Sequence, residues 1–194
     1  TIGTFMNPTN PYYVDFTDLY AHDLAAAREI IGEYGETREL VLKLPQNYEP
    51  HVKAGELYQE MLESAGLSVR IQLVDWSSWL SDVYRGGQFD FTVIGHTGKL
   101  DPHGRLVMFE DDDNYVGWTT TEVVSLIEEG RRTFAVEERR EIYAEMLEIL
   151  ARDLPFVYVG SPYRYVGLRK EVEGFKMDPQ LDTYDFRETS IGRE

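Results

Sequence analysis

The stretch ELVLKLPQNYEPHVKAGELYQEMLESAGLSVRIQLV, residues 39–74, decides the fold. Its first part alternates apolar and polar residues and stops at Pro45, which predicts a strand near 38–44. Apolar residues at helical spacing follow and end at Gly66, and the alternation then resumes near 68–74. This order of strand, helix and strand favours two parallel strands joined by a right-handed crossover.

Further elements follow from the same patterns on both sides of this stretch. Asp23 is suited to cap a helix that Gly35 ends, and Gly86 with Gly87 ends a shorter one. The apolar runs FDFTVIG and FVYV are typical of buried strands. The sequence therefore predicts an α/β fold with a mixed, mostly parallel central sheet flanked by helices. The additional predicted elements are helices over about 23–35, 77–84, 122–133 and 137–154, and strands near 89–95 and 156–160.

Composition limits the classes of function. The chain has 194 residues, 42% of them hydrophobic, which suffices for a folded core. Its 35 acidic and 19 basic residues give a net charge of −16, which would repel nucleic acid and anionic membranes, so we expect no nucleic-acid partner. No run approaches the ~20 apolar residues of a membrane span, and the first residues lack the pattern of a signal peptide. Because the chain has no cysteine, disulfides and thiol catalysis are excluded.

Loops at the ends of the predicted strands carry the candidate site. The stretch VIGHTGKLDPHG, residues 93–104, runs from an apolar strand into glycines, two histidines, a lysine and an Asp-Pro pair. Such a segment must bend sharply, and open α/β sheets bind ligands at the carboxyl ends of their strands. Two other strand ends lie at 45–50 and 75–79. Aromatic rings in such loops suit a cleft for a small molecule.

Five pieces of the sequence, taken together and in their order along the chain, resemble the extracellular solute-binding proteins of the peptide, nickel and opine class that serve ABC importers. The resemblance runs over about 20–179 and implies a periplasmic-binding-protein-like (type II) lobe. The matching pieces are HDLAAAREIIGEYG, GELYQEMLESAGLSVRIQLVDWSSWL, GGQFDFTVIG, LDP and VEERREIYAEMLEILARDLPFVYV.

The resemblance also implies which residues contact the ligand, because the family binds it at the carboxyl ends of its strands. Dipeptide-binding relatives have an Arg two residues before a Tyr, where this chain has Gln46 before Tyr48, and an Asp near the position of Lys99. Both charged partners of a zwitterionic dipeptide are thus missing or reversed, which argues against dipeptides. The predicted ligand-binding residues are Gln46, Tyr48, Trp76, Gly95, His96, Thr97, Lys99 and Asp101.

Metal binding and catalysis are the alternative functions for these residues. His96, Asp101 and His103 could ligate a metal, but no helical spacing holds the two histidines together, and a role in the turn is favoured. The acidic residues of segment 110–114 resemble those of a calcium-binding loop. The sixth position of such a loop needs a glycine and is Val116 here, which favours a solvated turn. We therefore expect no metal and no cofactor. The chain carries neither a GxSxG nor an HExxH motif, so an enzyme is a minor alternative, as is a protein-interaction module.

By resemblance, the chain is expected to be the C-terminal lobe of a larger, monomeric, periplasmic or extracellular protein. That protein would capture an oligopeptide, or alternatively an oligosaccharide, and deliver it to ABC permease subunits in the membrane. Residues 1–17 would form an extended lead-in, residues 18–169 the α/β lobe, and residues 170–194 a tail crossing toward the other lobe.

Overall fold

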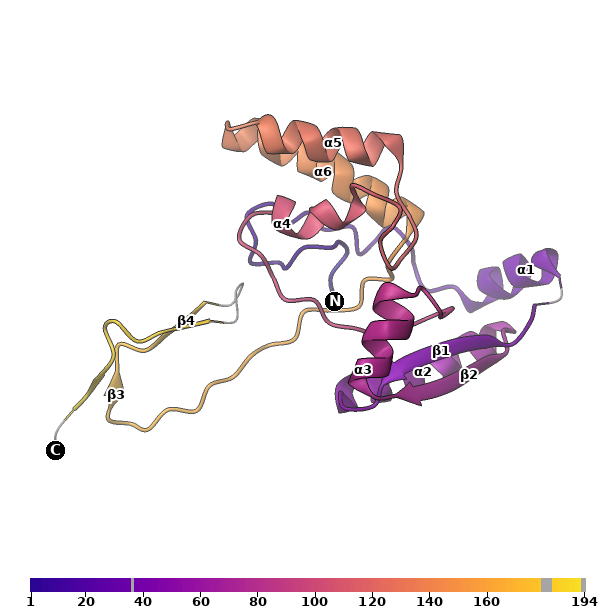
Figure 1. The fold of residues 1–194 in the computed structure, drawn as a ribbon, viewed down its shortest axis with the longest axis horizontal. Helices are drawn as coiled ribbons and strands as arrows, with labels where there is room; N and C mark the ends of the chain where they lie inside the picture. Colours follow the sequence, from indigo (N-terminus) through magenta and orange to yellow (C-terminus); the bar gives the residue numbers. More distant parts are fainter. Residues whose placement is uncertain (36, 179–182, 193–194) are drawn as a thin grey trace. The chain divides into compact units, whose positions relative to one another are not determined.

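The predicted strand–helix–strand unit is present in the computed structural model of the protein (Figure 1). Strands β1 (Leu40–Pro45) and β2 (Val69–Val74) pair in parallel along their whole length. Helix α2 (Glu49–Ala65) joins them and packs against both, and it ends at Gly66 in the left-handed conformation. Since parallel strands need such a crossover, the sequence pattern and the topology agree.

The structure describes residues 1–35, 37–178 and 183–192. These fall into two units, each of which is described by itself. Unit 1 comprises Thr1–Tyr20, His96–Asp111 and Trp118–Glu194, and unit 2 comprises Ala21–Gly95 and Asp112–Gly117.

The core of unit 2 lies between the two-stranded sheet and α2. Leu42, Leu44 and Val69 are buried there. Gly55 lets α2 approach the sheet closely, because a Cβ at this position would lie 2.3 Å from a methyl carbon of Leu44. Helix α1 (Leu24–Tyr34) packs on α2, so the helix predicted over 23–35 is confirmed.

The helix predicted over 77–84 is also present. It begins as α3 (Trp76–Ser78), continues as the π-helical segment η1 (Trp79–Arg85) and ends at Gly86. Trp79 and Val83 are its buried residues. The π-helical geometry was not predicted.

The strand predicted near 89–95 is wrong as a strand. Phe91 makes a single parallel bridge with Leu42, with Lys43 N donating to Phe91 O at 2.9 Å. The Val41 N–H of β1 is not available to a backbone carbonyl of a third strand, because it donates to the Asp90 carboxylate at 2.7 Å. A third strand therefore starts beside β1 but does not continue.

Unit 1 is built on a pair of helices, α5 (Thr121–Arg132) and α6 (Val136–Asp153), and both predicted helices are confirmed. Two short helices, α4 (His103–Leu106) and η2 (Val107–Phe109), pack beside α5 (Figure 1). The buried apolar core of this unit consists of Met6, Leu106, Phe109, Val123, Leu126, Ile127, Tyr143, Met146, Leu147 and Leu150.

Arg139 on α6 contacts several segments of unit 1. Its guanidinium binds both carboxylate oxygens of Asp101, at 2.7 and 2.8 Å, and donates to Gly130 O at 2.8 Å and Tyr143 Oη at 3.2 Å. It also lies over the ring of Tyr12, 5.7 Å from the centroid. One side chain thus joins α6, the end of α5, the loop before α4 and the N-terminal segment.

The strand predicted near 156–160 is wrong. Within the described part of unit 1, no helix or strand includes these residues. Phe156 stacks on Phe5 at 4.9 Å instead, while Val157 is 78% exposed. The apolar run satisfied the pattern of a buried strand, but the segment pairs with no strand there and packs through its rings.

The C-terminal segment forms two short antiparallel pairings. Strand β3 (Val172–Glu173) pairs with β6 (Ser190–Ile191), and β4 (Lys176–Asp178) pairs with β5 (Thr183–Asp185). The helices of the described residues are all too short or too polar to cross a bilayer.

Our first prediction compares one substitution in two helices. A Cβ at Gly130 on α5 would lie 2.7 Å from the buried ring of Tyr143, whereas at Gly32 on α1 it would meet nothing within 4 Å. We expect Gly130→Ala to lower the free energy of unfolding by about 1–3 kcal/mol through overpacking. Gly32→Ala should raise it by about 0.5–1 kcal/mol through helix propensity. Urea titrations followed by circular dichroism measure both, and a stabilising Gly130→Ala would contradict the packing.

The second prediction concerns acid stability. Arg139 lowers the pKa of Asp101 through their hydrogen bonds. The pair therefore stabilises the fold above the unfolded-state pKa of about 4, and this contribution is lost as pH falls through the lower folded-state pKa. We expect Asp101→Asn to cost about 1 kcal/mol at neutral pH, a value discounted for the half-exposed carboxylate.

The difference between Asp101→Asn and the parent protein should shrink in urea titrations near pH 3. Asp18→Asn, at an exposed position of the same unit, serves as the control and should change little. A destabilisation by Asp101→Asn that is the same at both pH values would contradict the role of the charge.

Candidate functional site

The carboxyl ends of β1 and β2 bring two of the predicted residues together. After β1, Gln46 N still donates to Val74 O at 2.9 Å, and Tyr48 then starts α2. Trp76 follows β2 by two residues. The rings of Tyr48 and Trp76 meet edge to face, with centroids 5.3 Å apart. Gln46 is exposed beside them in the sequence.

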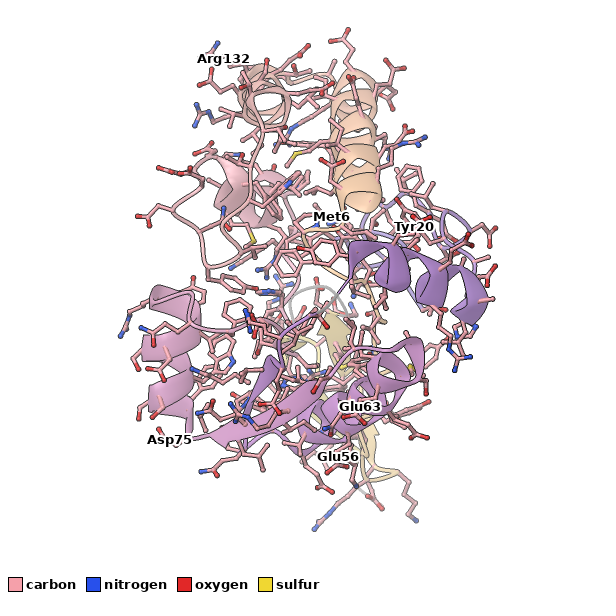
Figure 2. All side chains as sticks on the ribbon, turned by 90° about the vertical axis from the view of Figure 1, so that its right-hand side faces the viewer. Met6, Tyr20, Glu56, Glu63, Asp75 and Arg132 are labelled. Carbon is pink, nitrogen blue, oxygen red and sulfur yellow. The ribbon has the colours of Figure 1, made fainter. Side chains whose placement is uncertain are left out.

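The position of Trp76 is fixed by the residue before it. Asp75 caps α3: one carboxylate oxygen accepts Ser78 N at 3.0 Å and the other accepts Ser78 Oγ at 2.7 Å. Figure 2 labels Asp75 at the start of this helix. Hydrogen bonds from Ser77 and Ser78 hold the pKa of Asp75 well below its ordinary value, so the cap is ionised at neutral pH.

Two residues beside this group are not among the predicted ligand-binding residues. Trp79 lies parallel to Trp76 at 5.0 Å, and His51 on the first turn of α2 lies 5.2 Å from Tyr48. Burial lowers the pKa of His51, so its imidazole is neutral at neutral pH. The spacing of His51 three residues after Tyr48, on a helix turn, was the signal that could have found it.

Gly95 lies against His51. A Cβ at Gly95 would lie 3.5 Å from His51 Nε2, which is ordinary van der Waals contact, so the backbone of Gly95 lies close to the imidazole. The other ring nitrogen, His51 Nδ1, is buried and has no hydrogen-bond partner among the described residues. We call Tyr48, His51, Trp76, Trp79 and Gly95 the aromatic corner. All of its members belong to unit 2.

In unit 1, His96 and Thr97 are both tied to Arg105 on α4. The guanidinium donates to His96 Nδ1 at 3.3 Å and to Thr97 O. His96 also contacts the rings of Phe5 and Phe156, at 5.5 and 5.9 Å. Loss of water around the imidazole, and secondarily the charge of Arg105, lower the pKa of His96 to about 4. His96 is therefore neutral at pH 7. Arg105 is not among the predicted ligand-binding residues.

Lys99 and Asp101 have structural partners in the same unit. Lys99 O accepts the side-chain amide of Asn10 at 3.1 Å, and the Lys99 stem lies against Gly104. Asp101 accepts His103 N at 2.9 Å in addition to its two bonds from Arg139. These contacts fix the loop backbone. Their roles in ligand binding stay predictions.

The metal-binding alternatives concern His96, Asp101, His103 and the acidic segment 110–114. Among residues 1–35, 37–178 and 183–192, no three His, Cys, Asp or Glu side chains are grouped to hold a metal ion. In the acidic segment, Asn114 Oδ1 accepts Val116 N and Gly117 N at 3.0 and 3.1 Å, which is the geometry of a turn closed by a side chain.

The arrangement offers binding groups of two kinds. Unit 2 presents aromatic rings and a neutral imidazole, and unit 1 presents a loop held by a guanidinium. Neutral hydrogen-bonding groups and ring faces are suited to hold a polar organic molecule without an ion pair.

Comparison with known proteins finds relatives both in sequence and in structure. A curated relative, di/tripeptide-binding protein 1 of Pseudomonas aeruginosa, is 26% identical over 200 residues, which cover 97% of this chain but 37% of the relative. The chain therefore spans little more than a third of that relative's length.

Two solved structures share the fold. The oligopeptide-binding protein AppA of Bacillus subtilis, in complex with a nonapeptide, has a TM-score of 0.79 at 18% identity, over 98% of this chain and 42% of AppA. A mannohexaose-bound periplasmic oligopeptide-binding protein of Thermotoga maritima has a TM-score of 0.64 at 22% identity, over 71% of this chain and 30% of the other. The fold class is therefore the predicted α/β, type II periplasmic-binding-protein-like one.

The sequence model of the bacterial extracellular solute-binding proteins, family 5 (middle part), matches residues 1–116, more than half of the chain. Together with the fold and with the rings gathered at the carboxyl ends of its parallel strands, this match shows that the chain belongs to that family of solute-binding proteins.

Proposed function

We propose that this chain is part of the substrate-binding component of an ABC importer, which captures an oligopeptide outside the cytoplasmic membrane and delivers it to a permease. The observation that carries the proposal is the aromatic corner, which stands at the strand ends of a chain that belongs to the solute-binding family. The proposal needs neither a catalytic residue nor a cofactor, and it assigns the protein no enzymatic activity.

The names of the relatives support a peptide as the ligand. The relative at 26% identity is a di/tripeptide-binding protein, and AppA is described in complex with a nonapeptide. We favour a longer peptide over a dipeptide because Gln46 and Lys99 do not supply the two charges that would match a zwitterion. A peptide held by its backbone needs neutral donors and acceptors instead.

An oligosaccharide is the second candidate. The Thermotoga maritima protein of the same fold is described with mannohexaose bound. Indole faces suit sugar rings, and Trp76 is 36% exposed at the strand ends. The neutral character of the aromatic corner is compatible with either ligand.

We further propose the arrangement of the whole protein. Residues 18–169 form one lobe of a two-lobed monomer, residues 1–17 lead in from the hinge, and the tail 170–194 crosses toward the other lobe. In the tail, Tyr184 and Phe186 are 48% and 63% exposed, which suits a segment that packs against a surface outside this chain.

The third prediction tests the ligand class. The full-length protein should be stabilised by tri- to pentapeptides, or by oligosaccharides if the second candidate is right, in a thermal-shift screen. A ligand at 100 times its Kd would add about 2.7 kcal/mol. Calorimetry on this chain alone should give an affinity weaker by about tenfold or more, since closure between two lobes excludes water.

Equal affinities in the two proteins would mean that the site lies wholly within this chain. A strong stabilisation by a dipeptide that Lys99→Ala abolishes would contradict the assignment of the loop. Turnover of any of these compounds would contradict the binding function itself.

The fourth prediction tests delivery to the permease. The acidic segment Asp111–Asp113 is exposed and is a candidate contact with the transporter. Reversing its three charges should leave ligand affinity unchanged and reduce uptake by cells. The matched control reverses Glu137, Glu138 and Glu141 on α6, which are also exposed. Unchanged uptake in the first variant would exclude this segment as the contact.

A further inference from the structure

Unit 2 contains a second place where polar groups gather, on the sheet formed by β1 and β2. It is a cleft with a volume of about 330 Å³, and we call it the polar cleft. None of the residues of the aromatic corner lines it. Its polar lining residues are Arg38, Lys43, Gln72, Gln88 and Asp90, all of which belong to unit 2.

Lys43 is the buried charge of the polar cleft. Successive side chains of a strand point to opposite faces, so Lys43 lies on the face of the sheet away from Leu42 and Leu44, which form the core with α2. Its side chain is 9% exposed, and among the described residues its ammonium has one acceptor, a carboxylate oxygen of Asp82 at 3.5 Å. An ammonium has three N–H donors, and a buried one is costly unless they are bound. Lys43 therefore has donors left for a group in the cleft.

The ion pair with Asp82 alone does not satisfy Lys43. A distance of 3.5 Å lies beyond the 2.7–2.9 Å that is usual for a charge-assisted hydrogen bond. The Asp82 carboxylate is 38% exposed, and its other oxygen accepts Ser81 Oγ at 2.8 Å. The carboxylate is thus shared with water and a hydroxyl, and it contributes one long contact to the buried ammonium.

The polar cleft also contains two side-chain amides, those of Gln72 and Gln88. Gln72 on β2 is the register partner of Lys43 on β1, and neighbouring strands lie about 5 Å apart, so the two side chains share one face of the sheet. Neither amide has a hydrogen-bond partner in the part of the chain that the structure describes. Each amide has two N–H donors. Three side chains of the lining thus offer donors to the cleft.

Asp90 is the only carboxylate among the described residues that line the cleft, and it is engaged. Both of its oxygens accept hydrogen bonds from the Arg38 guanidinium, and one also accepts Val41 N at 2.7 Å. These hydrogen bonds lower the pKa of Asp90 to about 2, so it is ionised at neutral pH, and Arg38 matches its charge. The remaining charge of the lining is the ammonium of Lys43, which favours an anion in the cleft over a cation.

We propose that the polar cleft is a binding site for a small oxyanion, either inorganic phosphate or the carboxylate of a small organic acid. The anion accepts hydrogen bonds from the ammonium of Lys43 and from the amides of Gln72 and Gln88, and it supplies the acceptors that Lys43 lacks. A volume of about 330 Å³ corresponds to roughly ten water molecules, which is enough for such an ion and too little for an oligopeptide. The site is separate from the aromatic corner and goes beyond the proposed function.

The fifth prediction is tested on the full-length protein through its melting temperature in sodium phosphate, sodium acetate and sodium chloride, at pH 7 and equal ionic strength. We expect phosphate or acetate to raise the melting temperature over chloride by about 1–3 °C, because an anion that binds only the folded state stabilises it. Phosphate also stabilises folded proteins through its exclusion from their surface. The quantity to compare is therefore the part of the shift that a substitution in the cleft removes. A response to only one of the two oxyanions identifies which kind the cleft binds.

Two variants remove the site in opposite ways. Lys43→Met keeps a long side chain without the ammonium, and it should lose this part of the shift. Gln72→Glu puts a carboxylate beside Lys43, so it should raise the melting temperature in chloride and abolish the response to an added oxyanion. Gln72→Glu carries the test if Lys43→Met does not fold. Lys53→Met is the matched control and should keep the whole shift, because Lys53 is a lysine of the same unit that is 69% exposed on α2.

Loss of the oxyanion response in Lys43→Met and Gln72→Glu, but not in Lys53→Met, would support the site. A response that both cleft variants keep would mean that the anion binds elsewhere and would overturn the proposal. Equal melting temperatures of the parent protein in the three salts would overturn it as well. Because the cleft and the aromatic corner share no residue, Lys43→Met should leave the affinity for peptides unchanged, and a loss of that affinity would contradict the separation of the two sites.

Discussion

The parallel pairing of β1 with β2 is the constraint on which the organisation of unit 2 depends. Because the two strands run the same way, α2 must carry the chain back along the sheet, and Gly55 is needed where this helix approaches Leu44. The same direction places both carboxyl ends at one edge, so the residues after Pro45 and Val74 meet there. The whole of α2 and β2 separates Tyr48 from Trp76 in the sequence, yet their rings touch. The candidate site is thus a consequence of strand direction rather than of a local motif.

In unit 1, the ion pair between Arg139 and Asp101 joins the segments around the helix pair α5 and α6. Arg139 has four polar or aromatic partners from separate segments, and its side chain is mostly buried while the carboxylate of Asp101 is half exposed. A guanidinium with five donors in a planar fork is suited to such a role, and a lysine would not reproduce it. Asp101, selected from the sequence as a ligand residue, is thereby also the residue that fixes the loop after Lys99. A residue with both roles would couple the shape of the loop to the stability of the helices.

Periodicity predicted the helices and the β1–β2 pair correctly, because each of these elements carries its own pattern of apolar residues. Periodicity failed for residues 89–95 and 156–160. An apolar run is necessary for a buried strand, but the strand also needs a neighbouring strand whose edge is free to pair with it. Asp90 occupies the Val41 N–H, and Phe156 packs on Phe5. For the candidate site, the strand ends indicated Tyr48 and Trp76. Trp79, His51 and Arg105 were not selected, because their positions depend on ring stacking and on hydrogen bonds between distant residues. The spacing of residues in the sequence does not predict a hydrogen bond such as that between Trp79 and Thr92.

The neutrality of the aromatic corner has a consequence for how selective such a site can be. Ion pairs select ligands by charge and position, and a buried charge without its partner is costly, so they reject ligands sharply. Rings and neutral imidazoles reject little, since many ligands offer a flat face and an uncharged polar group. His51 is neutral because burial lowers its pKa, and the rings of Tyr48 and Trp76 carry no charge, so each group tolerates variation in the ligand. A site made of ring faces would therefore recognise the repeating, uncharged part of its ligand, and any discrimination between peptide and sugar would have to come from the groups that surround the rings.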